Sequence, residues 1–231
     1  MLDAIKRRLP TAQFEGGAID EPATAFAGTL DEAFCMIACI GAPNPLSPDE
    51  SFITSAWWWP DVGAALNQRQ AHIIVSVSGV DDAQRRSIQL AKLTAAIIEA
   101  APTAIGVIWD PADAVWQADM FRQSVDAAAD ALPVAIVMSA KISGDSEFTQ
   151  PNGARAWMGM TFGLDHFGLM ELEVRGWQGD PHTLIGLLLD VGSYVLHSGP
   201  VIADGDTMGP EDGGKFRIHH QASTIASGKT V

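Results

Sequence analysis

The stretch MGMTFGLDHFGLMELEVRG, residues 158–176, decides the fold that we predict from the sequence. Apolar residues at every second position of segment 157–162 give the period of a β-strand. Segment 172–175 alternates apolar and charged residues, which predicts a half-exposed antiparallel strand with its charges facing water. Gly163 and Gly168 lie between the two strands and suit a tight turn whose backbone needs positive φ.

A helix follows in PHTLIGLLLDVGSYVLHSG, residues 181–199, where leucine and valine recur at helical spacing. Asp180 is placed to cap its first turn, Pro181 suits the first helical position, and Gly199 ends the helix. Residues 200–220 then give an acidic loop and the strand-like run FRIHH. The predicted order in this half of the chain is strand, strand, helix, strand.

The first half of the chain shows the same order. Short apolar runs predict strands at Phe34–Ile40 and His72–Val77. A helix with a broad apolar face follows between residues 81 and 102, and AIGVIW predicts a strand at Ala104–Trp109. This helix and the strands on either side of it have the length of a βαβ unit, in which the two strands are parallel.

Four segments complete the predicted elements. We expect a helix at Ala114–Ala131, with its apolar side chains, Met120 among them, facing inward. A strand is predicted at Pro133–Ala140, followed by a polar connection over residues 142–155. The polar tail QASTIASGKTV, residues 221–231, is expected to fray or to add an edge strand.

The predicted fold class is α+β, with mixed, largely antiparallel β structure and helices packed on it. We expect residues 1–30 to be a leader or loosely ordered arm, and residues 31–231 to form a single domain. The repeated order of elements also fits two similar lobes, residues 31–141 and 155–231.

Composition narrows the class of protein. The chain has 231 residues, 47% of them hydrophobic, which is enough to bury a core. Its formal net charge of −14 repels phosphate backbones and anionic membranes, so we predict neither nucleic acid nor membrane as a partner. No secretory signal pattern is evident, and no apolar run approaches the roughly 20 residues that span a bilayer. Cys35 and Cys39 lie too far apart on one strand for a disulfide, which favours a reducing, cytoplasmic location.

Three consecutive tryptophans, Trp57, Trp58 and Trp59, form the most unusual local feature. In an extended chain Trp57 and Trp59 share one face, and Trp58 points the other way. One interpretation is that two rings cap the edge of the core while the third lies on the surface. The other is that the rings form the wall of a pocket or a site for a protein partner.

Several segments occur in a characteristic order: QAHIIVSVSG, the long helix after it, AIGVIWDP, TFGLDHFGLMELEVRG and VIADGDTMG. Together they resemble a family of bacterial proteins called domain of unknown function 4261. The resemblance covers about residues 34–220 and implies an α+β bacterial protein without a settled activity. It supplies no catalytic residue, and small α+β immunity proteins offer an analogy of fold only.

Cofactor and metal motifs are absent from the sequence. GPEDGGKF, residues 209–216, has the spacing of a phosphate-binding loop. Phe216, however, stands where serine or threonine should bind Mg²⁺, and a strand-like run follows where a helix is needed. Asp204, Asp206 and Glu211 lack the spacing of an EF-hand loop, and no histidine or cysteine pattern indicates zinc. We predict no cofactor and no metal.

Five polar residues are the catalytic candidates: His72, Asp165, His166, Glu171 and Asp206. Histidine and carboxylate side chains serve as general acids and bases, and these five lie near predicted strand ends. The simpler interpretation is that they decorate turns and wet strand faces around an apolar core.

We therefore predict a non-catalytic protein-interaction module, of which an immunity protein is one form. It presents an acidic surface and residues 57–60 to a protein partner. The alternative is an enzyme with a dispersed histidine and carboxylate site, with metal-assisted hydrolysis as one reaction. A structural domain whose associated protein does the binding is the third interpretation. The oligomeric state is left open.

Overall fold

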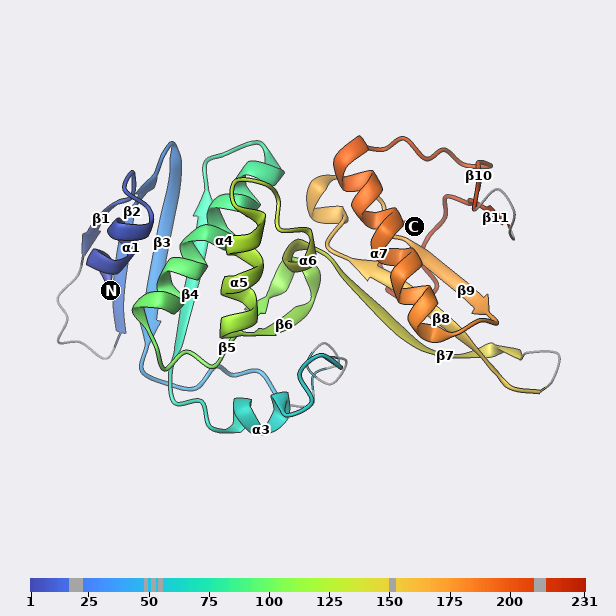
Figure 1. The fold of residues 1–231 in the computed structure, drawn as a ribbon, viewed down its shortest axis with the longest axis horizontal. Helices are drawn as coiled ribbons and strands as arrows, with labels where there is room; N and C mark the ends of the chain where they lie inside the picture. Colours follow the sequence, from blue (N-terminus) through green and yellow to red (C-terminus); the bar gives the residue numbers. More distant parts are fainter. Residues whose placement is uncertain (17–22, 48–49, 51–52, 54–55, 150–152, 210–214) are drawn as a thin grey trace. The chain divides into compact units, whose positions relative to one another are not determined.

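The computed structural model describes the chain except for residues 17–22, 48–49, 51–52, 54–55, 150–152 and 210–214 (Figure 1). The described residues divide into two compact units, Met1–Val137 and Met138–Val231. Antiparallel sheets and helices make up both units, so the predicted α+β class is confirmed.

The first unit is built on a four-stranded antiparallel sheet (Figure 1). Its strands in spatial order are β1 (Gln13–Gly16), β2 (Ala23–Leu30), β3 (Ala33–Ile40) and β4 (His72–Ser78). Along β3, Ala33, Cys35 and Ile37 are buried while Phe34 and Met36 are exposed. This alternation gives the sheet one core face and one open face. The predicted strands β3 and β4 are confirmed.

Helix α4 (Ala83–Ala100) packs on the core face of this sheet. The Asp82 side chain accepts hydrogen bonds from the backbone N–H of Gln84 at 2.9 Å and of Arg85 at 3.2 Å. These bonds satisfy two free donors of the first turn, so the helix starts where the sequence predicts. The core of the sheet and helix consists of Ile5, Ala12, Phe14, Phe26, Leu30, Ala33, Cys35, Ile37, Val80, Leu93, Ala96 and Ile97.

The N-terminal residues take part in this unit, which differs from the expected leader or arm. Helix α1 (Leu2–Arg8) buries Ile5 in the core. Strands β1 and β2 then pair with each other, placing Phe14 and Phe26 on the core face. The composition of this segment is typical of a loop, but burial of Ile5, Phe14 and Phe26 stabilises it as regular structure.

A separate hairpin follows α4, made of β5 (Gly106–Trp109), the 3-10 turn η1 (Asp110–Ala112) and β6 (Ala114–Gln117). Strand β5 pairs antiparallel with β6, and in the described residues it makes no ladder with β4. The predicted βαβ unit is therefore wrong. Asp113 adopts a left-handed φ of 47°, and this residue turns the chain back on itself.

Helix α5 (Ala118–Ala128) starts four residues after the predicted start, because the intervening residues form β6. Phe121 and Val125 are buried, but Met120 is 37% exposed, contrary to the prediction. The short helix α3 (Val62–Asn67) precedes β4 in the chain.

The predicted strand Pro133–Ala140 is wrong over its first half. Helix α6 (Val134–Val137) occupies it, and the Pro133 carbonyl accepts hydrogen bonds from Ile136 at 2.8 Å and Val137 at 3.1 Å. Proline fits this position because the first residue of a helical turn has no need of its N–H group. Residues 142–155 are not a polar connection, because β7 extends through most of them.

The second unit has a three-stranded antiparallel sheet of β7 (Ser139–Thr149), β8 (Arg155–Phe162) and β9 (Glu173–Trp177). The 3-10 turn η2 (Asp165–Phe167) joins β8 to β9. Gly163 has a φ of 112° and Gly168 a φ of 73°, as the turn requires. The predicted strand–turn–strand stretch is confirmed.

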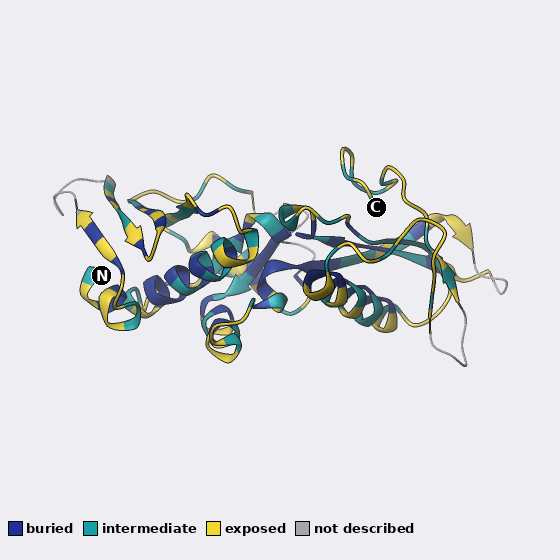
Figure 2. Ribbon diagram, turned by 90° about the horizontal axis from the view of Figure 1, so that it is seen from above, coloured by how far each residue is buried: buried dark blue, intermediate teal, exposed yellow. Residues whose placement is uncertain are grey.

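Helix α7 (Pro181–Ser198) packs on one face of this sheet, and the C-terminal residues lie on the other (Figure 2). Asp180 caps the helix by accepting a hydrogen bond from the Thr183 N–H at 3.1 Å. Gly159 permits close packing, because an added Cβ there would lie 2.8 Å from Cδ1 of Leu188.

A two-residue pair, β10 (Thr207–Met208) with β11 (Phe216–Arg217), completes the unit. The predicted strand at Phe216 is thus present, although shorter than expected. None of the helices in the described part of the chain has both the length and the apolar character needed to cross a bilayer.

Candidate functional site

The face of the second sheet opposite α7 carries the densest group of polar side chains that we find. Glu173 and Arg175 on β9 contact residues 221–231, which we call the C-terminal segment. Met160 on β8 also contacts this segment, through its sulfur at 3.5 Å from the Ser223 hydroxyl. The segment thus acts as a third layer on the sheet (Figure 2).

Backbone hydrogen bonds fold the C-terminal segment into a hairpin. The N–H groups of Gln221 and Val231 donate to each other's carbonyls at 2.8 and 2.9 Å. Ser223 donates to the Lys229 carbonyl at 2.9 Å, and Gly228 takes a φ of 79° in the turn. The Thr230 carbonyl accepts from the Glu171 N–H at 3.1 Å, which joins the hairpin to the sheet. The segment therefore neither frays nor adds an edge strand.

Glu171 is the centre of one polar cluster and is only 1% exposed. Its Oε2 accepts from the Thr161 hydroxyl at 2.7 Å, and its Oε1 accepts from the Gly163 N–H at 2.8 Å. Lys229 Nζ lies 3.4 Å from Oε1 and 2.6 Å from Asp165 Oδ2. A carboxylate predicted to face water is therefore buried and surrounded by donors.

Burial and neighbouring charges set the ionisation of this cluster. Burial raises the pKa of Glu171, and the hydrogen bonds from Thr161 and Gly163 oppose that rise. Burial also acts to raise the pKa of Asp165, but the hydrogen bond and charge of Lys229 outweigh it and lower that pKa. The pKa of Lys229 is raised, because its two carboxylate partners overcome the effect of its own burial.

Glu173 binds the first strand of the C-terminal hairpin to β9 through Ser223 and Thr224. Its Oε2 accepts from the Ser223 hydroxyl at 2.6 Å and from the Thr224 N–H at 3.0 Å. The Thr224 hydroxyl donates to Oε1. Although partial burial acts to raise the pKa of Glu173, these hydrogen bonds lower it overall.

A buried ion pair lies beside Glu173. Arg175 donates to both oxygens of Asp145, at 2.7 and 2.8 Å, in a two-pronged geometry. Arg175 also contacts Glu147 at 3.0 Å and the Thr224 hydroxyl at 2.6 Å. The hydrogen bonds from Arg175 hold the pKa of Asp145 well below its usual range, and Asp145 in turn raises the pKa of Arg175.

Two lysines approach one aromatic ring at the same end of the sheet. Lys141 Nζ lies 4.6 Å from the centre of the Phe162 ring, and Lys229 Nζ lies 5.7 Å from it. At these distances the ring face attracts both cations. Phe162 thereby supports the position of Lys229 next to its carboxylates.

These contacts hold the C-terminal segment and the strands of the sheet together, and they leave few side-chain atoms free to act in catalysis. A general base needs an accessible lone pair within reach of substrate, and Glu171, Glu173 and Asp145 direct theirs to protein donors. Within the described residues, no group of three or more His, Cys, Asp or Glu side chains is arranged to hold a metal. The phosphate-loop motif at 209–216 lies mostly outside the described residues.

The structure brings together two of the five catalytic candidates, Asp165 and Glu171, around Lys229. His166 lies in the same turn with its ring 5.4 Å from Phe167. Asp206 accepts from the Ala203 N–H at 2.8 Å in a turn of its own. His72 belongs to the first unit, where its Nδ1 is 2.8 Å from the Ala42 carbonyl. A catalytic role for them stays a prediction.

Sequence reasoning missed the residues that complete this face, above all Asp145 and Lys229. Asp145 was predicted to lie in the polar connection 142–155, and Lys229 was predicted to lie in the polar tail 221–231. The one available signal was the alternation of Glu171, Glu173 and Arg175, of which Glu171 lies just before β9 and the other two lie on it. Three ionisable residues on one strand face require either water or partners, and the chain supplies partners.

The three tryptophans separate into two inside and one outside. Trp59 is buried, and Trp58 stacks on Trp116 with ring centres 5.1 Å apart. Trp58 also donates from Nε1 to the Val115 carbonyl at 2.9 Å. Trp57 is 63% exposed. A turn in the chain lets two neighbouring rings enter the core, which an extended strand would not allow.

The first sheet offers a surface of a different kind on its open face, which we call the outer face. Phe34 is 50% exposed, Met36 41% and Ile74 49%. Strand pairing sets them close together, because Met36 lies opposite Ser76 and Ile74 lies opposite Ala38. The positions of β2, β3 and β4 on this face carry no Asp, Glu, Lys or Arg.

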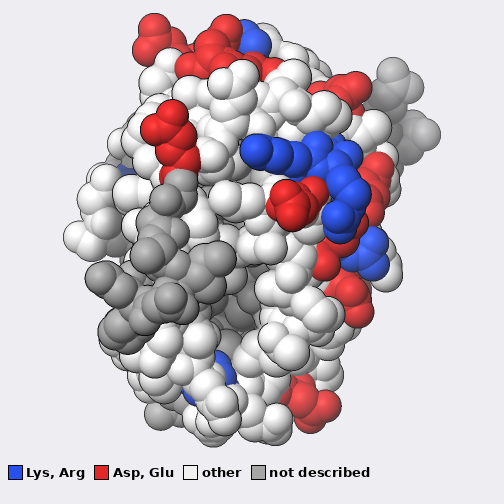
Figure 3. Space-filling view, turned by 90° about the vertical axis from the view of Figure 1, so that its left-hand side faces the viewer, with Lys and Arg blue, Asp and Glu red and all other residues white. Residues whose placement is uncertain are grey.

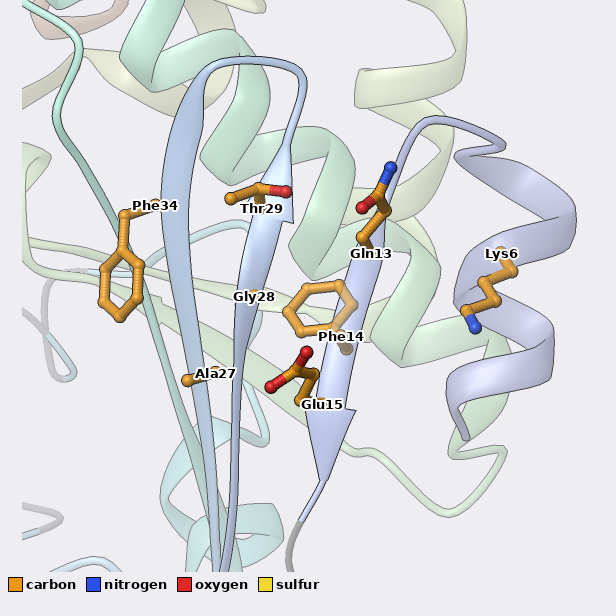
Figure 4. Close-up of a pocket in the computed structure, with 8 residues that line it drawn as sticks. All are labelled: Lys6, Gln13, Phe14, Glu15, Ala27, Gly28, Thr29 and Phe34. Atoms are coloured by element: carbon orange, nitrogen blue, oxygen red, sulfur yellow. The ribbon is translucent and has the colours of Figure 1, made fainter.

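A hollow of about 580 Å³ lies at one end of the outer face (Figure 4). Side chains from α1, β1, β2 and β3 line it: Lys6, Gln13, Phe14, Glu15, Ala27, Gly28, Thr29 and Phe34. Figure 4 shows Phe34 at one end and Lys6 at the other. Gly28 lets β1 lie close to β2 here, since an added Cβ would lie 2.8 Å from Cα of Phe14.

Comparison with known families gives one match. Residues 160–231 match the family described as Domain of unknown function (DUF4261). The chain is therefore similar to this family, as the sequence resemblance implied, and the matched range covers the end of β8, the Glu171 cluster and the C-terminal segment. No curated protein and no solved structure matches the chain.

Proposed function

We propose that the protein binds a protein partner through the outer face of its first sheet and catalyses no reaction. The observation that carries the proposal is the exposure of Phe34, Met36 and Ile74 close together on the part of this face formed by β2, β3 and β4, which carries no charged residue. Contiguous apolar surface on a folded domain marks an interaction site. An immunity protein that masks a toxin is one form of such a module.

The polar clusters of the second unit support the same proposal. Glu171, Glu173 and Asp145 are held by internal donors, so they contribute to the fold without offering a reactive group. Trp57, exposed at 63%, is a second apolar contact for a partner.

The test is capture of partners from host lysate by the tagged protein and by the triple variant Phe34→Ser, Met36→Ser, Ile74→Ser. We expect the wild type to retain a stoichiometric partner and the triple variant to retain at least tenfold less. The control variant Tyr194→Ser, Val201→Ser alters exposed apolar residues of the second unit and should bind like the wild type. Equal capture by the triple variant would contradict the proposal.

A further inference from the structure

We infer that the free edge of β4 binds an extended segment of the partner protein, which adds a fifth strand to the four-stranded sheet. The inference rests on the proposed function, because Ile74 of β4 belongs to the outer face and an added strand extends that face. It goes further by naming how the partner binds and what chemistry its segment has. In this mode main-chain hydrogen bonds supply affinity, and alternate side chains supply selectivity.

Strand β4 has unused backbone groups along one side. It is the last strand of its sheet, and among the described residues it forms a ladder with β3 alone (Figure 1). No described residue makes a backbone hydrogen bond to its other side. About half of the residues of an antiparallel edge strand direct their N–H and C=O groups away from the neighbouring strand. The seven residues of β4 therefore present a row of donors and acceptors about 23 Å long.

Strand β4 also lacks the features that keep other edge strands from pairing. The strands at the remaining edges of the two larger sheets all carry charged residues: Glu15 on β1, Lys141, Asp145 and Glu147 on β7, and Glu173 and Arg175 on β9. Figure 3 views the first unit from the side of α1 and β1, and both acidic and basic side chains lie on that surface. Strand β4, HIIVSVS, has no Asp, Glu, Lys, Arg or Pro, and its register with β3 runs without a bulge. Because charge, proline and bulges protect natural sheet edges, β4 is the edge that can accept a strand.

The apolar core is incomplete along β4. Ile73, Val75 and Val77 lie on the core face of the strand but are only partly buried. Ile37 and Cys35, which lie opposite Val75 and Val77 on β3, are fully buried. A fifth strand covers the open side of the β4 residues, and burial of this apolar surface favours binding. We therefore expect the segment to carry apolar, β-branched residues at alternate positions, on the side that faces the core.

Charge complementarity selects a basic segment over an acidic one. The whole chain carries a formal net charge of −14. Asp81 lies three residues after the end of β4, is exposed, and makes no ion pair with another residue in the described part of the chain. A lysine or arginine at the end of the segment next to Ser78 can pair with this carboxylate, whereas an acidic residue there is repelled.

The first test uses a peptide with these features and the isotopically labelled full chain. The probe has seven residues, alternating valine and threonine, with lysine at both ends. We expect it to bind with a dissociation constant below about 1 mM and to slow hydrogen exchange at alternate amides of β4, measured by NMR. The same peptide with glutamate at both ends should bind at least threefold more weakly at low salt. A lysine peptide that does not bind up to about 1 mM would overturn the inference.

The second test asks whether the backbone of the peptide makes the contact. Two further peptides carry N-methyl groups on alternate residues, one on the odd positions and one on the even positions. Only one side of a bound strand pairs with β4, so one peptide loses its pairing donors and the other keeps them. We expect one to bind at least tenfold more weakly and the other to bind like the parent peptide. Equal binding by the two would exclude strand pairing.

The third test alters the edge itself. Val75→Lys places a charge on the core side of β4, where it opposes an added strand, and should weaken peptide binding at least tenfold. Val75→Thr keeps a neutral β-branched residue and is the matched control, which should bind within about threefold of the wild type. Circular dichroism melts of both variants check folding. Unchanged binding by a folded Val75→Lys variant would place the peptide elsewhere and overturn the inference.

The outcomes separate this inference from the proposed function. If capture of the partner from lysate depends on Phe34 and Met36 while no peptide binds, strand addition is overturned and the outer face remains the partner site. If the peptides bind to β4 as expected while the triple variant captures as much partner as the wild type, the β4 edge stands and the outer face is not the partner site.

Discussion

The four-stranded and the three-stranded sheet each have one face on which no helix of the described residues packs, and these two faces differ in what covers them. On the second sheet, Glu171, Glu173 and Arg175 are covered by the C-terminal segment and bonded to it. On the first sheet, Phe34 and Met36 are left uncovered in the described residues. Charged residues near β9 are therefore bonded within the chain, while the apolar residues Phe34 and Met36 stay exposed.

The largest expected effect tests the fastening. Arg175→Met removes both hydrogen bonds to Asp145, whose side chain is fully buried, and leaves that carboxylate without a cation. We expect a loss of about 3 kcal/mol in the free energy of unfolding, measured by urea denaturation. Glu147→Ala, at an exposed neighbour of the same arginine, should cost less than about 0.5 kcal/mol. Equal losses in the free energy of unfolding for the two variants would contradict a stabilising role of the buried Arg175–Asp145 pair.

The pH dependence of stability should follow from the same pair. The pKa of Asp145 is lower in the folded state than its ordinary value of 3.8, so the folded state binds that proton less tightly. Its contribution is fully present above about pH 4 and is lost as pH falls through the lowered pKa. Denaturation curves at pH 5, 4, 3 and 2 should fall more steeply for the wild type than for Asp145→Asn. Parallel curves would contradict this assignment.

A smaller effect is expected from the hairpin contact. Ser223→Ala removes the hydrogen bond to Glu173 at 2.6 Å, and we expect a loss of about 1 kcal/mol. Because the C-terminal segment is held largely by polar contacts, hydrogen exchange of the Glu171 amide, which donates to Thr230, should accelerate before the core amides do. Ser227→Ala, at an exposed position of the hairpin turn, is the control.

The smallest effect is expected on the uncovered face. Phe34 is half exposed, so Phe34→Ser should change the free energy of unfolding by less than about 1 kcal/mol. Phe26→Ser, on the core face of the adjacent strand, should cost several times more, because its ring is buried. Comparable losses would mean that Phe34 is needed for the fold itself, which would remove the contrast between the two sheets.

Capping residues, which act locally, allowed two long helices to be predicted from the sequence. The helix after Asp180 and the helix after Asp82 start at their capping residues, because a cap acts within one turn. Strand β6 was missed because Val115 and Trp116 fit a helical pattern equally well. Only the left-handed turn at Asp113 places them in a hairpin, and sequence spacing does not reveal that turn.

The candidate site depended on contacts that no local pattern reports. Glu171 meets Lys229 across 58 residues of sequence, and Arg175 meets Asp145 across 30. Alternation on β9 showed that its charged residues share a face, but it could not show that another part of the chain covers that face. The predicted wet face was therefore wrong for Glu171, which is buried just before β9 begins.

The separation between Glu171 and Lys229 has a consequence for how the protein is made. During synthesis the glutamate leaves the ribosome 58 residues before the lysine that neutralises it. At about 5–20 residues per second, the second sheet waits several seconds for the hairpin that covers its polar face. Over that interval a nascent chain exposes β8 and β9 to chaperones and to neighbouring chains, so slowing translation after residue 175 should increase its aggregation.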